Sequence, residues 1–100
     1  MHRKIDPEAV RDFAYKLALL AVHHPFTVTS WLRTPKRNAL VGGKAESRHL
    51  DGLGADCVLD KDEPAMPFMT HARQLGLVVL DEGDHIHVQE GGNRFRPTIT

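Results

Sequence analysis

Residues 47–56 read Ser-Arg-His-Leu-Asp-Gly-Leu-Gly-Ala-Asp, and residues 84–87 read Asp-His-Ile-His. The first stretch contributes an imidazole at His49 and a carboxylate at Asp56, and the second contributes another imidazole at His87. Two imidazoles and one carboxylate are a ligand set of catalytic zinc sites, which leaves a coordination position for water. We therefore expect the fold to bring both stretches together around a Zn²⁺ ion.

The composition is typical of a globular domain. The chain has 100 residues, of which 41% are apolar and 26% charged, so we expect residues 1–100 to form one domain. Lysine plus arginine and aspartate plus glutamate both number 13. This balance argues against a nucleic-acid-binding protein, whose phosphate contacts need a basic surplus. Cys57 is the only cysteine, which excludes an internal disulfide and indicates a reducing compartment.

The sequence contains no sign of membrane insertion or export. No apolar run approaches the roughly twenty residues that cross a bilayer, and residues 1–4 lead into no signal-peptide core. We therefore expect synthesis in the cytoplasm without a signal peptide, and no membrane insertion. A monomer is a separate expectation, which no sequence motif supports.

Local signals predict the elements of the first half of the chain. Asp6-Pro7-Glu8 has the composition of a helix start, and apolar residues at three- and four-residue steps extend a helix over 6–22. Residues 26–32 alternate and are rich in β-branched side chains, which predicts a strand. The expected faces of this strand are Phe26, Val28 and Leu32 on one side and Thr27, Thr29, Trp31 and Arg33 on the other. Residues 35–40 are predicted to form a short helix or turn.

The second half predicts a strand, a helix and a hairpin. The expected elements are a strand over 55–59, a helix over 65–75, and strands over 77–80 and 85–89 joined by a turn over 81–84. Gly76 stands where the helix would terminate. The polar tail from Gly91 is interpreted as an edge strand or a loose end.

This order of elements predicts an α+β fold, with helices packed on one face of a small antiparallel sheet. On the last strand, period two gives one face to Ile86 and Val88 and the other to His85, His87 and Gln89. The apolar pair is expected in the core, and the histidines face a cleft or solvent. Asp56, at the start of another strand, can meet His87 on that face. Cys57 then points to the opposite face and is expected to be a small buried hydrophobe.

A zinc site that activates water for hydrolysis also needs a base that accepts a proton from the water and delivers it to the leaving group. Asp84 and His85 are the nearby candidates, although an aspartate after a glycine in a hairpin is also common for turn reasons alone. Arg33 can pair with a substrate carboxylate or hold a carbonyl oxygen, or it is an exposed arginine before a turn. Ser47 can hydrogen-bond substrate or orient His49, or it merely caps a turn.

The pattern Ser47-x-His49-x-x-Gly52-x-x-x-Asp56, followed by Asp84-x-x-His87, resembles the signature of the zinc D-alanyl-D-alanine carboxypeptidase family. This family includes D,D-dipeptidases and phage L-alanyl-D-glutamate endolysins. Upstream, the chain is similar to the segment that precedes the motif in these proteins, and it reads Arg-Thr-Pro-Lys-Arg-Asn-Ala-Leu-Val-Gly-Gly over residues 33–43.

The resemblance implies roles for individual residues. It implies that His49, Asp56 and His87 bind the zinc ion. It also implies that Asp84 is the catalytic base and that Arg33 steadies the substrate or the transition state. The fold that it implies is the one shared by the D,D-peptidases and the hedgehog signalling domain.

The wider superfamily, which also contains murein endopeptidases, often has a His-x-His pair whose second member binds metal. His85-Ile86-His87 fits that form, so His85 is an alternative to Asp84 as the base. The chain departs from the family in two respects. Gly54 stands where alanine is frequent, and the aromatic residues that often precede the second metal-binding histidine are missing.

The expected function is therefore a zinc-dependent peptidase that acts on peptidoglycan stem peptides, as a D,D-carboxypeptidase or an L-alanyl-D-glutamate endopeptidase. The resemblance also implies action at the cell wall or in the periplasm, with a phage-encoded protein as one alternative. Two other functions stay open. One is a non-catalytic zinc-binding or cell-wall-binding module of the same fold, and the other is an interaction domain without a metal ion.

Overall fold

The fold consists of three α-helices, a short 3₁₀ turn and four strands in the described part of the chain. The structure is a computed structural model that describes residues 5–44 and 47–91. The elements are α1 (Pro7–His23), β1 (Phe26–Ser30), α2 (Pro35–Leu40), the 3₁₀ turn η1 (Arg48–Leu50), β2 (Gly54–Leu59), α3 (Ala65–Gln74), β3 (Leu77–Asp81) and β4 (Ile86–Glu90). The four strands form one antiparallel sheet in the order β1-β2-β4-β3. The predicted α+β fold with an antiparallel sheet is confirmed.

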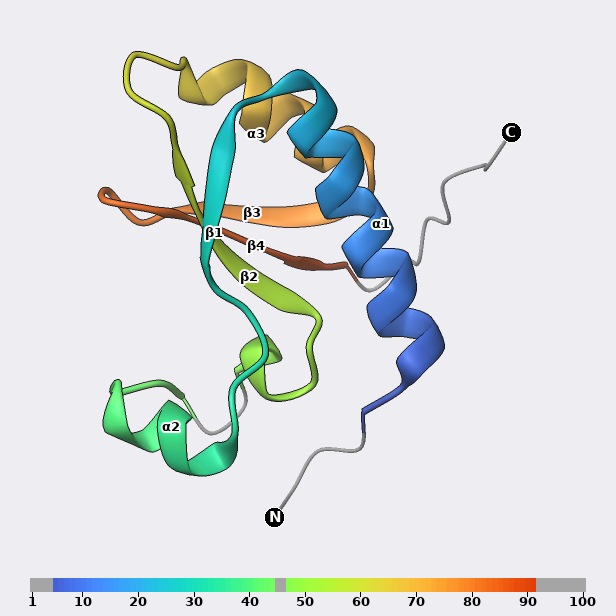
Figure 1. Cartoon of the computed structure of the whole chain (residues 1–100), viewed down its shortest axis with the longest axis vertical. Coiled ribbons are helices and arrows are strands. Elements are labelled where there is room, and N and C mark those ends of the chain that lie inside the picture. The colour runs from blue at the N-terminus through green and yellow to red at the C-terminus, as the bar shows by residue number, and fades with distance from the viewer. Residues whose placement is uncertain (1–4, 45–46, 92–100) are drawn as a thin grey trace.

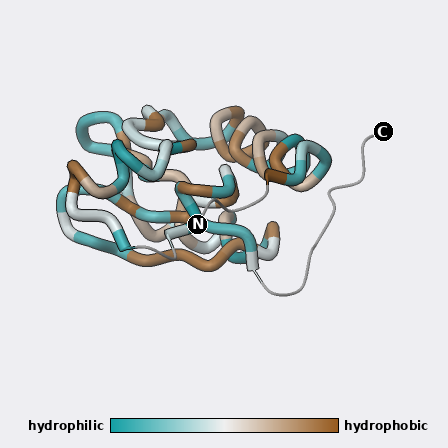
Figure 2. The backbone as a smooth tube through the Cα atoms, turned by 90° about the horizontal axis from the view of Figure 1, so that it is seen from below, coloured by the Kyte–Doolittle hydropathy of each residue, from teal (hydrophilic) through white to brown (hydrophobic). Residues whose placement is uncertain are grey.

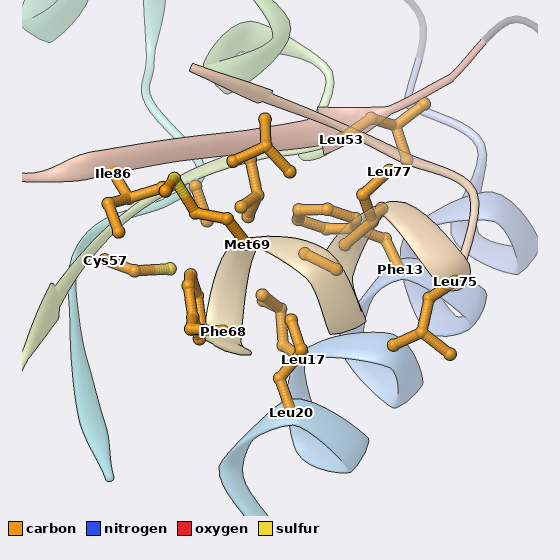
Figure 3. Packing of buried hydrophobic residues seen from close by; sticks show 14 of the residues in the cluster. Phe13, Leu17, Leu20, Leu53, Cys57, Phe68, Met69, Leu75, Leu77 and Ile86 are labelled. Atoms are coloured by element: carbon orange, nitrogen blue, oxygen red, sulfur yellow. The ribbon is translucent and has the colours of Figure 1, made fainter. Parts of the chain in front are cut away.

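The two longer helices, α1 and α3, pack on the same face of the sheet, whereas α2 lies beyond the end of β1 (Figure 1). Hydrophobic and hydrophilic residues alternate within single elements, as expected when each element buries one side (Figure 2). The buried side chains include Phe13, Leu17 and Leu20 of α1, Phe68 and Met69 of α3, and Cys57, Ile86 and Val88 of the sheet. Figure 3 shows the helical side chains pointing toward those of the strands. No helix among the described residues has the length and apolar character needed to span a bilayer.

Helix α1 begins and ends at the signals that the sequence contains. The Asp6 carboxylate accepts hydrogen bonds from the backbone N–H groups of Glu8 and Ala9, at 3.1 and 3.4 Å. These bonds satisfy amides that have no partner within the first helical turn. At the other end, His24 is extended, and Pro25 follows it. The helix therefore covers one residue more at its C-terminal end than the predicted 6–22.

The register of the sheet positions the two stretches that opened the sequence. Strand β4 lies between β2 and β3, and Asp56 of β2 is the direct antiparallel partner of His87 on β4. Directly opposed residues in a sheet point to the same face. Asp56 and His87 therefore share the face that α1 and α3 leave uncovered, and the expected meeting of these two residues is confirmed.

The end of β1 differs from the expected alternation. The pairing of β1 with β2 has an irregularity between Val28 and Ser30, and the strand ends at Ser30 instead of continuing to residue 32. An extra residue in a strand reverses the faces of all residues after it. Trp31 accordingly packs against Phe13 of the core, with ring centroids 6.2 Å apart, whereas Leu32 is exposed. The predicted faces for these two residues were wrong.

Cys57 is fully buried in the core, as its position next to Asp56 predicted. Burial, together with the negative charge of Asp56, raises the pKa of the thiol to about 12. The thiol therefore stays protonated at neutral pH and is not available as a metal ligand.

A buried ion pair joins α1 to the end of β4. The Lys16 ammonium lies 2.5 Å from a Glu90 carboxylate oxygen, and both side chains are almost completely excluded from solvent. The hydrophobic pattern of α1 did not indicate that a lysine would be buried here. The long alkyl stem of Lys16 packs with the apolar residues while its charged end meets a carboxylate.

We expect Glu90→Gln to lower the free energy of unfolding by about 1–3 kcal/mol, because it removes the negative charge that faces the buried ammonium. Urea denaturation monitored by circular dichroism measures the change. Glu63→Gln is the matched control, since Glu63 is exposed and its neutralisation is expected to change stability by less than about 0.5 kcal/mol. Equal unfolding midpoints for the two variants would contradict a stabilising pair.

Candidate metal centre

His49, Asp56 and His87 converge on one point. His49 Nε2 lies 3.2 Å from Asp56 Oδ1, and His87 Nδ1 lies 3.0 Å from the same oxygen. One ligand atom from each residue falls within 4.8 Å of the other two, and no other group of three or more such residues in ranges 5–44 and 47–91 does so. At a Zn–N distance of 2.0–2.1 Å, two ligands of a tetrahedral zinc ion are about 3.3 Å apart. The separations therefore suit donors that share one ion.

His49 is positioned by the turn that precedes β2. Its backbone N–H donates to the Ser47 hydroxyl oxygen at 3.2 Å, which caps η1. Its Nδ1 lies 2.7 Å from the Trp31 carbonyl oxygen, and the Trp31 indole N–H donates to the Gly52 carbonyl oxygen at 2.8 Å. A carbonyl oxygen only accepts hydrogen bonds, so Nδ1 carries the proton and Nε2 presents its lone pair to Asp56.

His87 is oriented in a similar way by a neighbour on its own strand. Its Nε2 lies 2.8 Å from Gln89 Oε1, two residues along β4. With this oxygen as the acceptor, Nε2 carries the proton and Nδ1 is directed at Asp56. Two imidazole lone pairs that face one carboxylate oxygen repel it unless a cation lies between them. The donor set therefore fits a divalent metal ion.

The electrostatics keep the ligands in their metal-binding forms. Burial is the main cause that lowers the pKa of His49, and it outweighs the raising effects of the Trp31 carbonyl and of Asp56. Burial by itself would raise the pKa of Asp56, but the close contact with His87 and the charges of the nearby imidazoles bring it below its usual value. A neutral His49 and an ionised Asp56 at neutral pH are the protonation states that coordinate a metal.

Gly54 makes room for this arrangement. A Cβ atom at this position would lie 2.9 Å from Arg48 Cβ and 3.2 Å from Cε1 of the His87 ring. Alanine here would require Arg48 to shift, because real Cβ atoms essentially never approach within 3.0 Å, and the His87 ring would have to move by a few tenths of an ångström. The departure at Gly54 therefore matches the close packing of His87 against η1 in this chain.

Arg33 contacts the outer oxygen of Asp56. Its Nη2 lies 3.3 Å from Asp56 Oδ2, while Nε donates to the Ser30 hydroxyl at 3.1 Å and Nη1 to Asn38 Oδ1 at 3.3 Å. Asn38 is buried, and its Nδ2 donates to the Lys44 carbonyl oxygen at 2.8 Å. Arg33 thus holds Asp56 so that Oδ1 faces the imidazoles, and Asn38 holds Arg33.

Of the two candidate bases, His85 lies next to Asp56, and Asp84 contacts the other side of the His85 ring. His85 Nδ1 is 2.6 Å from Asp84 Oδ1, and His85 Nε2 is 3.8 Å from Asp56 Oδ1. Asp84 itself is 91% exposed. The Asp84 hydrogen bond is the main cause that raises the pKa of His85, and the charges of Asp56 and Glu82 add to it. His85 is therefore the group that faces the metal ligands, and Asp84 reaches them through His85.

The comparison with protein families agrees with the geometry. A family model described as Peptidase M15 matches residues 5–89, which include all three converging ligands. The chain belongs to the peptidase M15 family. Peptidases of the M15 family are zinc-dependent, and the cluster of His49, Asp56 and His87 is the place in this member where the ion could bind. A search of the curated proteins found no match.

In this M15 family member the cluster opens into a cleft of about 530 Å³. Besides the three ligands, the residues that line the cleft include Arg33, Lys44, Ser47, Arg48, Glu82 and His85. Ser47 therefore both caps η1 and faces the cleft, and the two roles considered for it are compatible. Asp84 is not among the lining residues.

Some residues that hold this M15 site were not singled out from the sequence. Gln89 had a signal, because it shares the face of His87 at period two, but no role was assigned to it. Asn38 was part of the upstream pattern without a role of its own. The role of the Trp31 carbonyl oxygen could not be predicted, because every residue has a backbone carbonyl and the side chain does not indicate which one accepts a hydrogen bond.

Proposed function

We propose that this chain is a zinc-dependent peptidase that hydrolyses peptide bonds in peptidoglycan stem peptides, with the specificity of a D,D-carboxypeptidase or an L-alanyl-D-glutamate endopeptidase. The observation that carries the proposal is the convergence of His49, Asp56 and His87 at the floor of an open cleft, with His85 beside them. Membership of the peptidase M15 family supports the same reaction class.

Different residues of the chain have different roles in the proposed reaction. A bound zinc ion would lower the pKa of a water molecule towards neutrality and polarise the scissile carbonyl. His85 accepts the proton of that water at Nε2 and later returns it to the departing amine. Asp84 holds the other ring nitrogen, so that Nε2 points toward the metal ligands. Trp31 and Gln89 keep the ligand imidazoles in the required tautomers.

The charges of the cleft support a substrate with carboxylate groups. Arg33, Lys44 and Arg48 line it from the segments before β2, and Glu82 lines it from the β3–β4 hairpin. Arg33 and Arg48 already contact Asp56 and Asp51, so a substrate carboxylate would meet their remaining N–H groups. Stem peptides carry free carboxylates close to the bonds that such enzymes cut, and the protein would therefore act at the cell wall or in the periplasm.

Digestion of purified peptidoglycan by the zinc-loaded protein tests the proposal. We expect mass spectrometry to detect either free D-alanine or fragments with a new L-alanine carboxyl end, and the product identifies the bond that is cut. A chelator should abolish the release, and zinc added afterwards should restore it. A protein that binds zinc at the cleft and releases nothing would instead be a non-catalytic zinc-binding or wall-binding module.

A further inference from the structure

Three histidines meet on the helical side of the sheet, on the face opposite to Asp56 and His87. His24 Nε2 lies 3.1 Å from His71 Nδ1, and the centroids of the two rings are 5.2 Å apart. The His23 ring lies with its centroid 5.4 Å from that of His71. His23 and His24 end α1, whereas His71 belongs to α3, so the contact joins segments that are distant in the sequence.

The positions of His24 and His71 are fixed by packing. The His24 ring packs edge-on against Phe68, with centroids 5.8 Å apart at an interplanar angle of 89°. Phe68 is fully buried and lies three residues, about one helical turn, before His71 on α3. The backbone N–H of His24 donates to the Leu20 carbonyl oxygen at 2.8 Å, and Pro25 restricts the chain directly after it. The close approach of the two imidazoles therefore comes from the core and not from two freely moving surface side chains.

The surroundings favour a cation bound through neutral imidazoles. His23 lies in the last turn of α1 and His71 in the last turn of α3, where the helix dipoles place partial negative charge. Burial, followed by the charges of His24 and His23, lowers the pKa of His71. The His71 ring is therefore more readily neutral, and a neutral ring is the form that binds a metal ion.

We propose that His24 and His71 bind a second transition-metal ion, of the class that prefers imidazole ligands, such as Zn²⁺, Ni²⁺ or Cu²⁺. With metal–nitrogen distances of 2.0–2.1 Å, the 3.1 Å separation of the two nitrogens corresponds to an angle of about 100° at the ion, between the octahedral and tetrahedral values. The exposed His23 side chain supplies a third nitrogen by rotating about its Cα–Cβ bond, and water completes the coordination. The ion takes the place of the proton that the two rings otherwise share.

This site is independent of the proposed peptidase reaction. It contains two preformed donors and a third within reach, whereas among the described residues only His49, Asp56 and His87 already bring three ligand atoms within 4.8 Å. The ion would connect the end of α1 to α3, and these helices form one layer of the core. Its expected effect is therefore on stability, with a rise in the melting temperature as the ion is added.

Zinc titration by isothermal calorimetry tests the proposal with the full chain, produced without a histidine tag and stripped by a chelator. In a His49→Ala variant, which lacks a ligand of the cleft, one ion should still bind. Adding His71→Asn to this variant should abolish that binding, and His23→Asn should weaken it without abolishing it. Absence of any ion in the His49→Ala variant, or binding that survives His71→Asn, would overturn the second site, whatever the outcome at the cleft.

A measurement on the unmodified protein covers the case in which a variant does not fold. Paramagnetic Ni²⁺ broadens the NMR signals of imidazole protons near the ion. We expect the ring signals of His24 and His71 to broaden, separately from those of His49 and His87. Broadening that is confined to the cleft histidines would contradict the second site, and broadening of His24 and His71 alone would support it even if the peptidase proposal fails.

Discussion

Asp56→Asn is expected to remove the metal ion and the hydrolytic activity together. The Asp56 Oδ1 atom is the point that both imidazoles face, and Oδ2 is held by Arg33. An amide has nearly the same shape but no negative charge, so it cannot offset the charge of a divalent ion. Loss of an outer-shell partner typically lowers metal affinity 10–100-fold, and loss of this ligand should lower it by at least about 100-fold.

Elemental analysis after dialysis, together with the peptidoglycan digestion, measures both losses. Zinc bound by His24 and His71 would add to the measured content. The comparison is therefore made in a His71→Asn background, which removes that zinc. Asp60→Asn is the matched control, because Asp60 directly follows β2 and is exposed. Circular dichroism should show that both variants are folded. If Asp56→Asn kept its zinc at the cleft and full activity, the three-residue centre would be wrong.

His85→Ala should lower the rate of cleavage by about 10²–10⁴-fold while the zinc content of the cleft stays the same, because a general base contributes that much to the rate. His85 faces Asp56 through Nε2 and lines the cleft, but its Nε2 lies farther from Asp56 than the donor atoms of His49 and His87 do. Asp84→Asn should cost less, since Asp84 acts by orienting the His85 ring. Steady-state kinetics on a stem-peptide substrate separates the two effects.

The comparison between these variants decides which residue is the base. Equal losses for Asp84→Asn and His85→Ala in kcat, with zinc retained, would mean that the pair works as one unit. A larger loss for Asp84→Asn would transfer the role of the base to Asp84. Asp60→Asn is the control here as well, because Asp60 is exposed and is not among the residues that line the cleft. Loss of zinc in His85→Ala would make His85 a ligand.

Much of the fold could be predicted because its signals are local. The observed bounds of α2, Pro35–Leu40, are those expected from the proline at its start and the glycines that follow. Helix α3 ends where Gly76 adopts a positive φ of 83°, a conformation that glycine adopts without strain. The hairpin between β3 and β4 follows from the turn composition of residues 81–84. The interpretation of the tail from Gly91 concerns mainly residues 92–100, which lie outside the described residues.

The metal ligands of the candidate site could be predicted from the sequence, but the residues that hold these ligands in place could not. The residue types of the ligands and their alternation along the strands can be read from the sequence. The hydrophobic face of β4 places His87 on the opposite face, where it can meet Asp56. Arg33 contacts Asp56 from the segment that follows β1, and the path of this segment depends on backbone bonds such as that from the Arg33 N–H to the His49 carbonyl oxygen, which a side-chain pattern does not reveal. Lys16 of α1 can be buried because its ammonium group pairs with the Glu90 carboxylate, which is distant in the sequence. The periodicity of a single helix does not indicate such a pairing.

The central place of β4 in the sheet has a consequence for the assembly of the candidate metal centre. His87 comes from the last strand of the described chain, and that strand must enter between β2 and β3 before Asp56 has its partner. A nascent chain on the ribosome that has released His49 and Asp56 but not residues 86–90 therefore has no complete set of ligands. The complete set of His49, Asp56 and His87 therefore exists only after β4 has entered the sheet, so the topology makes a finished sheet the condition for a finished ligand set.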